Sequence, residues 1–210
     1  MTGLLHLVRH GQTTANVARI LDTLPPGAPL TPEGSDQARR FAAARPVPGG
    51  AGAVLLSSVA RRAQQTAELI GAGWGEPVTV IDGVHEVQAG DLEGRNDEES
   101  ITLFQDVVRR WHSGDLGAAL PGGESADDLL LRYLPAVEAV RADHLPERDA
   151  YLVSHGAAIR VVAARLAGVD GDYAHRHHLP NTAEIVLRPV ATGWELVSWA
   201  DAPSPVDPMG

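Results

Sequence analysis

Short apolar runs alternate with longer amphipathic stretches along most of this chain. The runs end at polar or glycine-containing segments, as buried strands do, whereas the stretches repeat apolar positions every three or four residues, as helices do. The pattern predicts strands at residues 4–8, 53–56, 78–81 and 151–153. It predicts helices at residues 32–45, 59–70, 101–111, 125–143 and 156–166.

Turn and capping residues sharpen two of these boundaries. Thr31 followed by Pro32 is an N-cap with proline at the first helical position, which marks the start of the first helix. Thr192-Gly193 separates two short runs at residues 183–187 and 194–199. Two such runs around a glycine turn predict an antiparallel hairpin.

Strands separated by helices of this length predict an α/β fold. We expect a three-layer sandwich, with a mostly parallel sheet, helices on both faces and the hairpin as an antiparallel edge. Residues 1–210 then form a single domain. The more polar middle, about residues 93–123, is expected to be a small helical cap insertion. Residues 49–52 predict a loop, and the proline-rich tail at 202–210 is expected to be loose.

Composition restricts the function more than the fold. The 210 residues carry 17 basic and 27 acidic side chains, for a formal charge of −10. This charge argues against nucleic-acid and anionic-membrane partners, because both bind a basic face. Cysteine is absent, which excludes disulfides and thiolate catalysis. The N-terminus has no basic region and no apolar run reaches membrane length, so a cytoplasmic location is expected.

Three strand ends carry the residues that suggest chemistry. Arg9-His10-Gly11 follows the first predicted strand, residues 58–62 follow the second, and Ser154-His155-Gly156 follows the fourth. Ligands of parallel sheets bind beyond the carboxyl ends of the strands, so these segments are expected to face one crevice. Glycine after each histidine allows close backbone approach, and Arg9 and Arg62 offer forked donors to oxyanions. The pattern predicts a pocket for a phosphoryl group.

Phosphoryl transfer needs a nucleophile, neutralisation of charge and a proton for the leaving oxygen. A neutral imidazole can attack phosphorus, while two arginines and a second histidine neutralise the equatorial oxygens. Glu86, just after the third predicted strand, is the candidate proton donor, because a bound phosphate and partial burial favour its protonated form. Asp91 and Glu93 are the alternative carboxyl groups.

Five segments of the chain, in this order, resemble the motifs of the histidine phosphatase superfamily, the phosphoglycerate-mutase-like group. They are LVRHGQTTAN at 7–16, SSVARRAQQTAE at 57–68, EVQAGDLEG at 86–94, PGGES at 121–125 and VSHGAAIR at 153–160. Their order and spacing cover nearly the whole chain. The second motif departs from the usual pattern, since Val59 and Ala60 stand where the family has proline and leucine.

The resemblance implies a role for each candidate residue. His10 would be the phosphorylated nucleophile and Glu86 the proton donor. The remaining members of the phosphate pocket would be Arg9, Arg62 and His155. Lesser polar or backbone contacts would come from Gln12, Asn16, Gly156 and the amide of Ala157. Arg62 is preferred to Arg61 because its spacing to the residues that follow matches the motif.

Three further segments give weaker indications of a functional role. The histidine-rich residues 175–178 match no common metal-ligand spacing, so we expect a solvated loop and no metal. Arg109 and Arg110 either recognise a second anionic group or lie on a solvated helix face. Asn181 and Thr182 are expected to cap or brace the site.

Together the residues and the resemblance predict a metal-independent phosphomonoester hydrolase. It would act without a cofactor, through a phosphohistidine, on a small phosphorylated metabolite, with neither nucleic acid nor membrane as partner. The alternatives are a cofactor-dependent phosphoglycerate mutase and, less favoured, a non-catalytic phosphate-binding protein. The short chain and acidic middle favour hydrolysis, because mutases of this resemblance tend to carry a larger, basic cap. A homodimer is left open by the sequence.

Overall fold

Six strands form one mixed sheet in the order β3-β2-β4-β1-β5-β6. The computed structural model describes residues 3–45 and 52–200, so most of the loop expected at 49–52 and the tail at 202–210 lie outside the described residues. The strands are β1 (Leu5–Arg9), β2 (Val54–Ser57), β3 (Val78–Val80), β4 (Ala150–Ser154), β5 (Glu184–Val190) and β6 (Gly193–Trp199). Strands β1 to β4 run parallel, and β5 and β6 form the antiparallel edge, as predicted.

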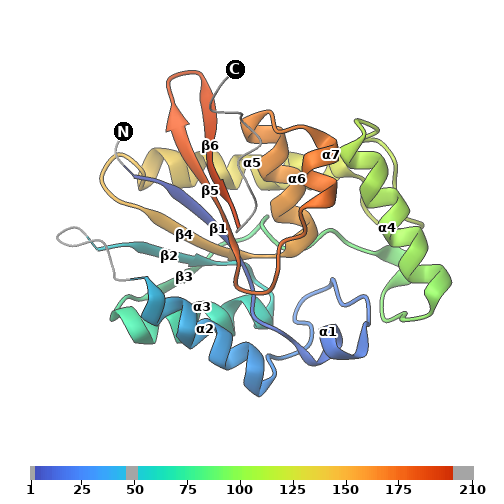
Figure 1. Cartoon of the computed structure of the whole chain (residues 1–210), viewed down its shortest axis with the longest axis horizontal. Helices are drawn as coiled ribbons and strands as arrows, with labels where there is room; N and C mark the ends of the chain where they lie inside the picture. The colour runs from blue at the N-terminus through green and yellow to red at the C-terminus, as the bar shows by residue number, and fades with distance from the viewer. Residues whose placement is uncertain (1–2, 46–51, 201–210) are drawn as a thin grey trace.

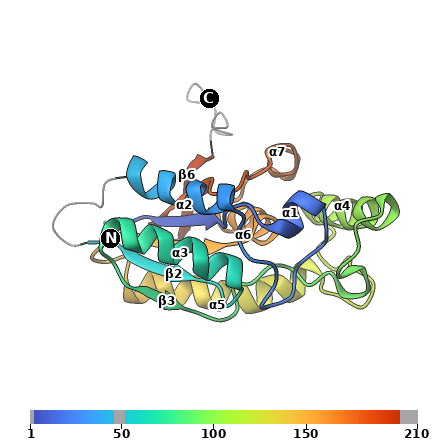
Figure 2. The same cartoon turned by 90° about the horizontal axis from the view of Figure 1, so that it is seen from below.

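Helices cover both faces of this sheet, which confirms the three-layer arrangement. They are α1 (Thr14–Ala18), α2 (Pro32–Ala44), α3 (Arg61–Trp74), α4 (Glu98–His112), α5 (Ala126–Asp143), α6 (Gly156–Ala167) and α7 (Gly171–Arg176), with a 3-10 turn at Gly90–Leu92. Figure 1 shows α2 and α3 on one side of the strands and α5 and α6 on the other. The view in Figure 2 shows α1 and α4 at the same end of the molecule.

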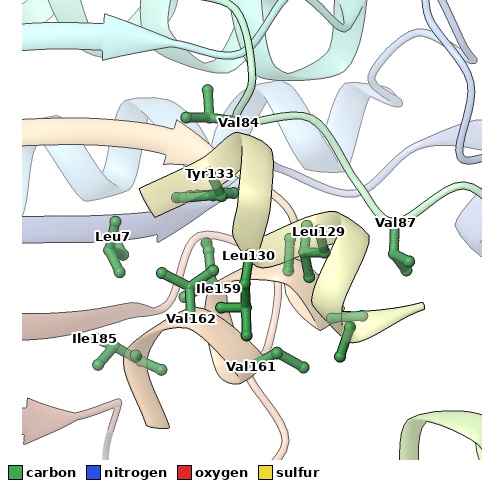
Figure 3. Packing of buried hydrophobic residues seen from close by; sticks show 14 of the residues in the cluster. Leu7, Val84, Val87, Leu129, Leu130, Tyr133, Ile159, Val161, Val162 and Ile185 are labelled. Carbon is green, nitrogen blue, oxygen red and sulfur yellow. The ribbon is translucent and has the colours of Figure 1, made fainter. Parts of the chain in front are cut away.

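The alternation of side chains along β1 explains the two cores. Leu5 and Leu7 belong to the cluster packed under α5 and α6, whereas Val8 belongs to the cluster under α2 and α3. The larger cluster is drawn in Figure 3, where Leu129 and Tyr133 from α5 surround the same apolar space as Ile159 and Val162 from α6. Both faces of the sheet are therefore dry, as its near-continuous apolar strands indicate.

Local capping sets the helix ends. Thr31 accepts a hydrogen bond from the Gly34 amide and places Pro32 at the first position of α2, as predicted. Helix α3 begins at Arg61 instead of residue 59, because Ala60 is still extended, and it continues past residue 70 to Trp74. Gly75, with φ of 74°, ends it in the left-handed conformation that glycine adopts at low cost.

The pattern of apolar positions does not predict two short helices, α1 and α7. Thr13 begins α1 through a capping box with Asn16. Asp170 accepts from the Tyr173 amide and begins α7, so the loop predicted at 175–178 is wrong for His175 and Arg176, which end this helix. Helices of five or six residues show less than two turns of periodicity, which hides them in the sequence. Within the described ranges, no helix is long and apolar enough to cross a membrane.

Candidate active site

The carboxyl ends of three neighbouring parallel strands bring the predicted segments together. Strand β4 lies between β1 and β2, and Arg9 at the end of β1 is paired in register with Ser154 at the end of β4. The His10 amide donates to the Ser154 carbonyl at 3.0 Å, which continues the pairing by one residue. His10 and His155, which follow these two strands directly, therefore lie at the same edge of the sheet.

The rings of His10 and His155 lie side by side. Their centroids are 5.3 Å apart, and the side chains are almost completely buried, with 4% of His10 and none of His155 exposed. His10 Nδ1 lies 2.7 Å from the carbonyl oxygen of Gly11. A carbonyl only accepts, so Nδ1 carries the proton in the neutral ring and the lone pair is on Nε2.

Burial and positive neighbours keep both rings neutral. Desolvation, followed by the charges of Arg62 and Arg9, holds the pKa of His10 well below its usual value. Desolvation and then Arg62 lower the pKa of His155 in the same direction. A neutral imidazole with a free Nε2 is the form that can act as a nucleophile at neutral pH.

Two arginines flank the histidines. Arg62 is 2% exposed, whereas the neighbouring Arg61 is exposed. Nη1 of Arg62 lies 3.4 Å from a carboxylate oxygen of Asp22. Of Arg61 and Arg62, Arg62 is the one that lines the cavity beside His10. Arg9 donates from Nη1 to the Leu179 carbonyl at 2.7 Å. A Cβ at Gly156 would lie 3.0 Å from Arg9 Nε, so glycine there lets this guanidinium pack closely against the backbone.

Two buried ring or guanidinium nitrogens in the crevice have no hydrogen-bond partner among the described residues. They are His155 Nδ1 and Arg9 Nε. The other ring nitrogen of His155 lies 2.9 Å from Ser58 Oγ. Both nitrogens can therefore form a hydrogen bond with a polar group that reaches them.

Glu86 is held at the start of α6. Its carboxylate accepts from the amides of Ala157 at 3.1 Å and Ala158 at 2.9 Å, and from its own neighbour Val87 at 2.9 Å. The carboxylate therefore caps the helix that follows His155. The Ala157 amide, which the resemblance directs toward phosphate, is occupied by Glu86 in this structure.

The alternative carboxyl groups lie elsewhere. Asp91 is exposed, and Glu93 accepts from the amide and hydroxyl of Thr23, which ties the loop after α1 to the 3-10 turn. Thr23 in turn accepts from the Ala89 amide at 2.9 Å. Glu86 is the one of the three acids that lines the crevice.

The crevice contains a cavity of about 130 Å³ between β1, α1 and α4. Its polar walls include Arg9, His10, Asn16, Arg62 and Glu86. A larger hollow of about 400 Å³ shares Arg9, Asn16 and Glu86 with it and is also lined by Gly156 and Ala157. Helix α4 supplies one apolar wall, through Phe104.

The remaining candidates divide between the crevice and its support. Gln12 lies outside the cavity lining, and its Oε1 accepts from the Thr31 hydroxyl at 2.9 Å. Asn181 donates to the His10 carbonyl at 2.9 Å, and the Thr182 amide donates to the Arg9 carbonyl at 2.9 Å. The expectation that residues 181 and 182 brace the site is confirmed.

The loop that carries Glu86 is held by two residues to which no sequence motif assigned a role. Arg132, on α5, donates to the carbonyls of Gly83, His85 and Glu86 at 2.8 to 2.9 Å. Its guanidinium also forms a bidentate pair with Glu124 at 2.8 Å. Glu124 belongs to the PGGES motif, whose glycines and acid were the available signal. We call Arg132 and Glu124 the loop clamp.

Arg160 is the last residue of the VSHGAAIR segment. It lies on α6, is 9% exposed and lines the larger hollow. Arg109 and Arg110 are the candidates for recognising a second anionic group. Both are half exposed and pair with Asp106 and Asp115. Among the described residues, no group of three or more metal-ligating side chains is close enough to hold an ion.

Comparison with known proteins agrees with the five motifs. The model of the histidine phosphatase superfamily (branch 1) matches residues 5–202. A probable phosphoglycerate mutase GpmB from Photorhabdus laumondii is 30% identical over 177 residues, which cover 84% of this chain and 80% of that protein. A putative phosphoserine phosphatase 2 from Hydrogenobacter thermophilus is 29% identical over 181 residues, 84% and 85% of the two chains.

Solved structures show the same fold. A mycobacterial glucosyl-3-phosphoglycerate phosphatase, solved in complexes with VO3, superposes with a TM-score of 0.79 at 27% identity. The match covers 96% of this chain and all of that one. The resemblance inferred from the motifs is confirmed over nearly the full length.

Proposed function

Because this chain belongs to branch 1 of the histidine phosphatase superfamily, we propose that it hydrolyses phosphomonoesters of small metabolites through a phosphohistidine at His10. The observation that carries the proposal is that His10, Arg9 and Arg62 line one cavity, with the ring of His155 5.3 Å from that of His10. Two neutral rings and two guanidinium groups suit a tetrahedral dianion, whose charge they neutralise without a metal.

In the first step, Nε2 of His10 attacks phosphorus and the bond from phosphorus to the alcohol oxygen breaks. The hydrogen bond from Nδ1 to the Gly11 carbonyl orients the ring and stabilises the charge that develops on it. Arg9 and Arg62 neutralise the equatorial oxygens, and the unpaired His155 Nδ1 is a further donor when that nitrogen carries the proton.

Glu86 completes the cycle as acid and then base. In its protonated form it gives its proton to the departing alkoxide, so that the alcohol leaves neutral. Water then attacks the phosphohistidine, the nitrogen–phosphorus bond breaks, and Glu86 takes the proton from that water. The Ala157 and Ala158 amides hold the carboxyl group of Glu86 beside the cavity.

Helix α4 and the segment around it are proposed to act as the cap. Ile101, Phe104 and Gln105 line the hollow beside the reacting groups, so a substrate there would lie against this helix. Exclusion of water by such a wall would strengthen the electrostatic contacts inside. A homodimer and a cytoplasmic location stay predictions.

Mutase activity is the second candidate, and the 30% identity to a probable phosphoglycerate mutase favours it. The same pocket would then return the phosphoryl group to the substrate instead of to water. Relatives described as a phosphoserine phosphatase and a glucosyl-3-phosphoglycerate phosphatase support hydrolysis. The difference lies in which acceptor reaches the phosphohistidine.

An assay of both reactions on one substrate separates the candidates. The protein is given 3-phosphoglycerate, with and without 2,3-bisphosphoglycerate, and both inorganic phosphate and 2-phosphoglycerate are measured. Hydrolysis predicts phosphate release that needs no bisphosphoglycerate and disappears in His10→Ala. Isomerisation that depends on bisphosphoglycerate, with little phosphate released, would establish the mutase. Phosphate release that survives His10→Ala would overturn the proposed nucleophile.

A further inference from the structure

The cavity at His10 continues into a set of hollows that the reacting phosphate does not need. The 400 Å³ hollow beside it shares Phe104, Gln105, Arg160 and His178 with a further hollow of about 270 Å³. These residues come from α4, from α6 and from the segment after α7. In Figure 1 these elements gather at one end of the sheet, together with α1.

Arg160 lies where these two hollows meet. It is 9% exposed, and its nearest acceptors are the carbonyls of Gly156 at 3.4 Å and Ala174 at 3.3 Å. Within the described part of the chain, no carboxylate lies within ion-pair distance of it. A buried cation held only by long contacts to carbonyls is costly unless an anion joins it.

Arg19 is a second arginine beside the larger of these hollows, and its side chain is exposed. It follows α1 with φ of 55°, a left-handed conformation that is uncommon for residues other than glycine. It lines the 400 Å³ hollow and, like Arg160, has no carboxylate partner in residues 3–45 and 52–200. The left-handed conformation ends α1, because it lets the Arg19 amide donate to the carbonyls of Ala15 and Asn16.

The charge of these hollows is opposite to that of the whole protein. The chain carries a formal charge of −10. The 400 Å³ hollow is nevertheless lined by Arg9, Arg19 and Arg160, and Glu86 is its one carboxylate. The further hollow contains Arg160, His175 and His178 with no acidic side chain. Burial and the neighbouring Arg160 lower the pKa of His178, as a positive potential there requires.

We propose that Arg160 and Arg19 form an anion subsite, which binds a second negatively charged group carried on the alcohol part of the substrate. The substrate class is then a phosphomonoester whose leaving group bears a carboxylate or a second phosphate. This inference rests on the proposed function for the position of the reacting phosphate at His10. Arg160 and Arg19 thus take the role for which Arg109 and Arg110 were candidates, because Arg109 and Arg110 are already paired with aspartates.

The test compares esters that differ in one group. 3-Phosphoglycerate and glycerol 3-phosphate differ by a carboxylate in place of a hydroxymethyl group, and glycerol 1,3-bisphosphate supplies a second phosphate. The measured quantity is the ratio of kcat/KM for each anionic ester to that for glycerol 3-phosphate. For at least one of the two anionic esters, the wild-type ratio is expected to be about ten or more, because a charge-assisted contact strengthens binding by about that factor. The larger ratio identifies the preferred anion.

Variants locate the source of the ratio. Arg160→Met is expected to lower it about tenfold, and Arg19→Ala about threefold because its charge is screened by water. Arg109→Gln, a matched arginine outside the hollow, should leave the ratio unchanged. A general loss of catalysis or of folded protein cancels in the ratio, so a merely structural role of Arg160 would not change it. If Arg160→Met fails to fold, the ratio measured for Arg19→Ala, at an exposed position, tests the subsite.

Each remaining outcome has one meaning. A wild-type ratio near one, or a ratio that neither arginine variant lowers, would overturn the subsite. Absence of hydrolysis of every ester would count against the proposed function instead. In that case the same ratio is taken from dissociation constants measured by calorimetry, and equal binding of charged and neutral esters would reject the subsite independently.

Discussion

The two ring nitrogens of His10 have different tasks. Nδ1 is fixed by the Gly11 carbonyl, and burial beside Arg62 and Arg9 lowers the pKa of the ring, so Nε2 keeps its lone pair at neutral pH. The same two guanidinium groups that would bind the phosphate therefore also maintain the nucleophile. Neither effect needs a metal.

Glu86→Gln should separate the acid from the nucleophile. Glutamine keeps the size of the side chain but gives no proton, so hydrolysis of an alkyl phosphate such as glycerol 3-phosphate should fall about 10²- to 10⁴-fold in kcat. Hydrolysis of p-nitrophenyl phosphate should fall much less, because nitrophenolate leaves without a proton. Steady-state kinetics on both esters measures the difference.

The neighbouring acids provide the control for Glu86. Asp91→Asn changes an exposed carboxylate of the same motif and should leave both rates near the wild-type values. Equal losses on the alkyl and aryl esters in Glu86→Gln would contradict the role of this residue as a proton donor.

Helix α5 controls the loop that carries Glu86. The loop clamp joins Arg132 to three backbone carbonyls of residues 83–86 and to Glu124, and Glu124 accepts from the Gln88 amide at 2.9 Å. Both clamp side chains are largely buried, at 17% and 15% exposed, so their contacts are weakly screened. The position of the acid thus depends on an element far from it in sequence.

Arg132→Met should therefore act through Glu86. We expect kcat for an alkyl phosphate to fall about 10- to 100-fold, with a smaller loss on p-nitrophenyl phosphate and little change in KM, because displaced catalytic groups lose rate before binding. Measurement of kcat and KM on both esters tests this prediction. A clamp that only stabilised the fold would reduce both rates equally.

A surface pair gives the matched control for the clamp. Arg188 and Glu195 pair at 3.0 Å but are half exposed, on β5 and β6. Arg188→Met removes the same charge and should leave the ratio of the two rates unchanged. If it altered that ratio as much as Arg132→Met, the proposed path from the clamp to Glu86 would be wrong.

The strand ends could be predicted from sequence, whereas the supports could not. Arg9, His10 and His155 follow apolar runs and precede glycine, so topology alone brings them to one edge. Arg132 contacts carbonyls 46 to 49 residues away, and Arg160 has backbone acceptors on two elements. Such contacts depend on how helices pack on the sheet, and no local pattern encodes them.

The whole molecule should lose stability as the pH falls below the ordinary histidine pKa. Burial holds the pKa values of His10 and His155 well below 6.5, and burial with nearby Arg160 lowers the pKa of His112 to about 4. Below pH 6.5 the unfolded chain therefore binds more protons than the folded one. Each such histidine then removes up to about 1.4 kcal/mol of stability per pH unit.

Urea denaturation at pH 7, 6 and 5 measures this loss. The free energy of unfolding should decrease steadily over that range, and the decrease should be shallower in His112→Gln. Leu131→Gln, at a side chain 78% exposed, should retain the wild-type slope. A free energy of unfolding that stays constant from pH 7 to 5 would show that the buried histidines are not held neutral.

The proposed hydrolysis requires a covalent bond between phosphorus and His10. The most direct measurement is mass spectrometry of the protein quenched during turnover of an aryl phosphate and then digested. We predict an added phosphoryl group on the peptide that contains His10, stable in alkali, lost in acid and absent from His10→Ala. A phosphoryl group on another residue, or one that persists in His10→Ala, would contradict the account.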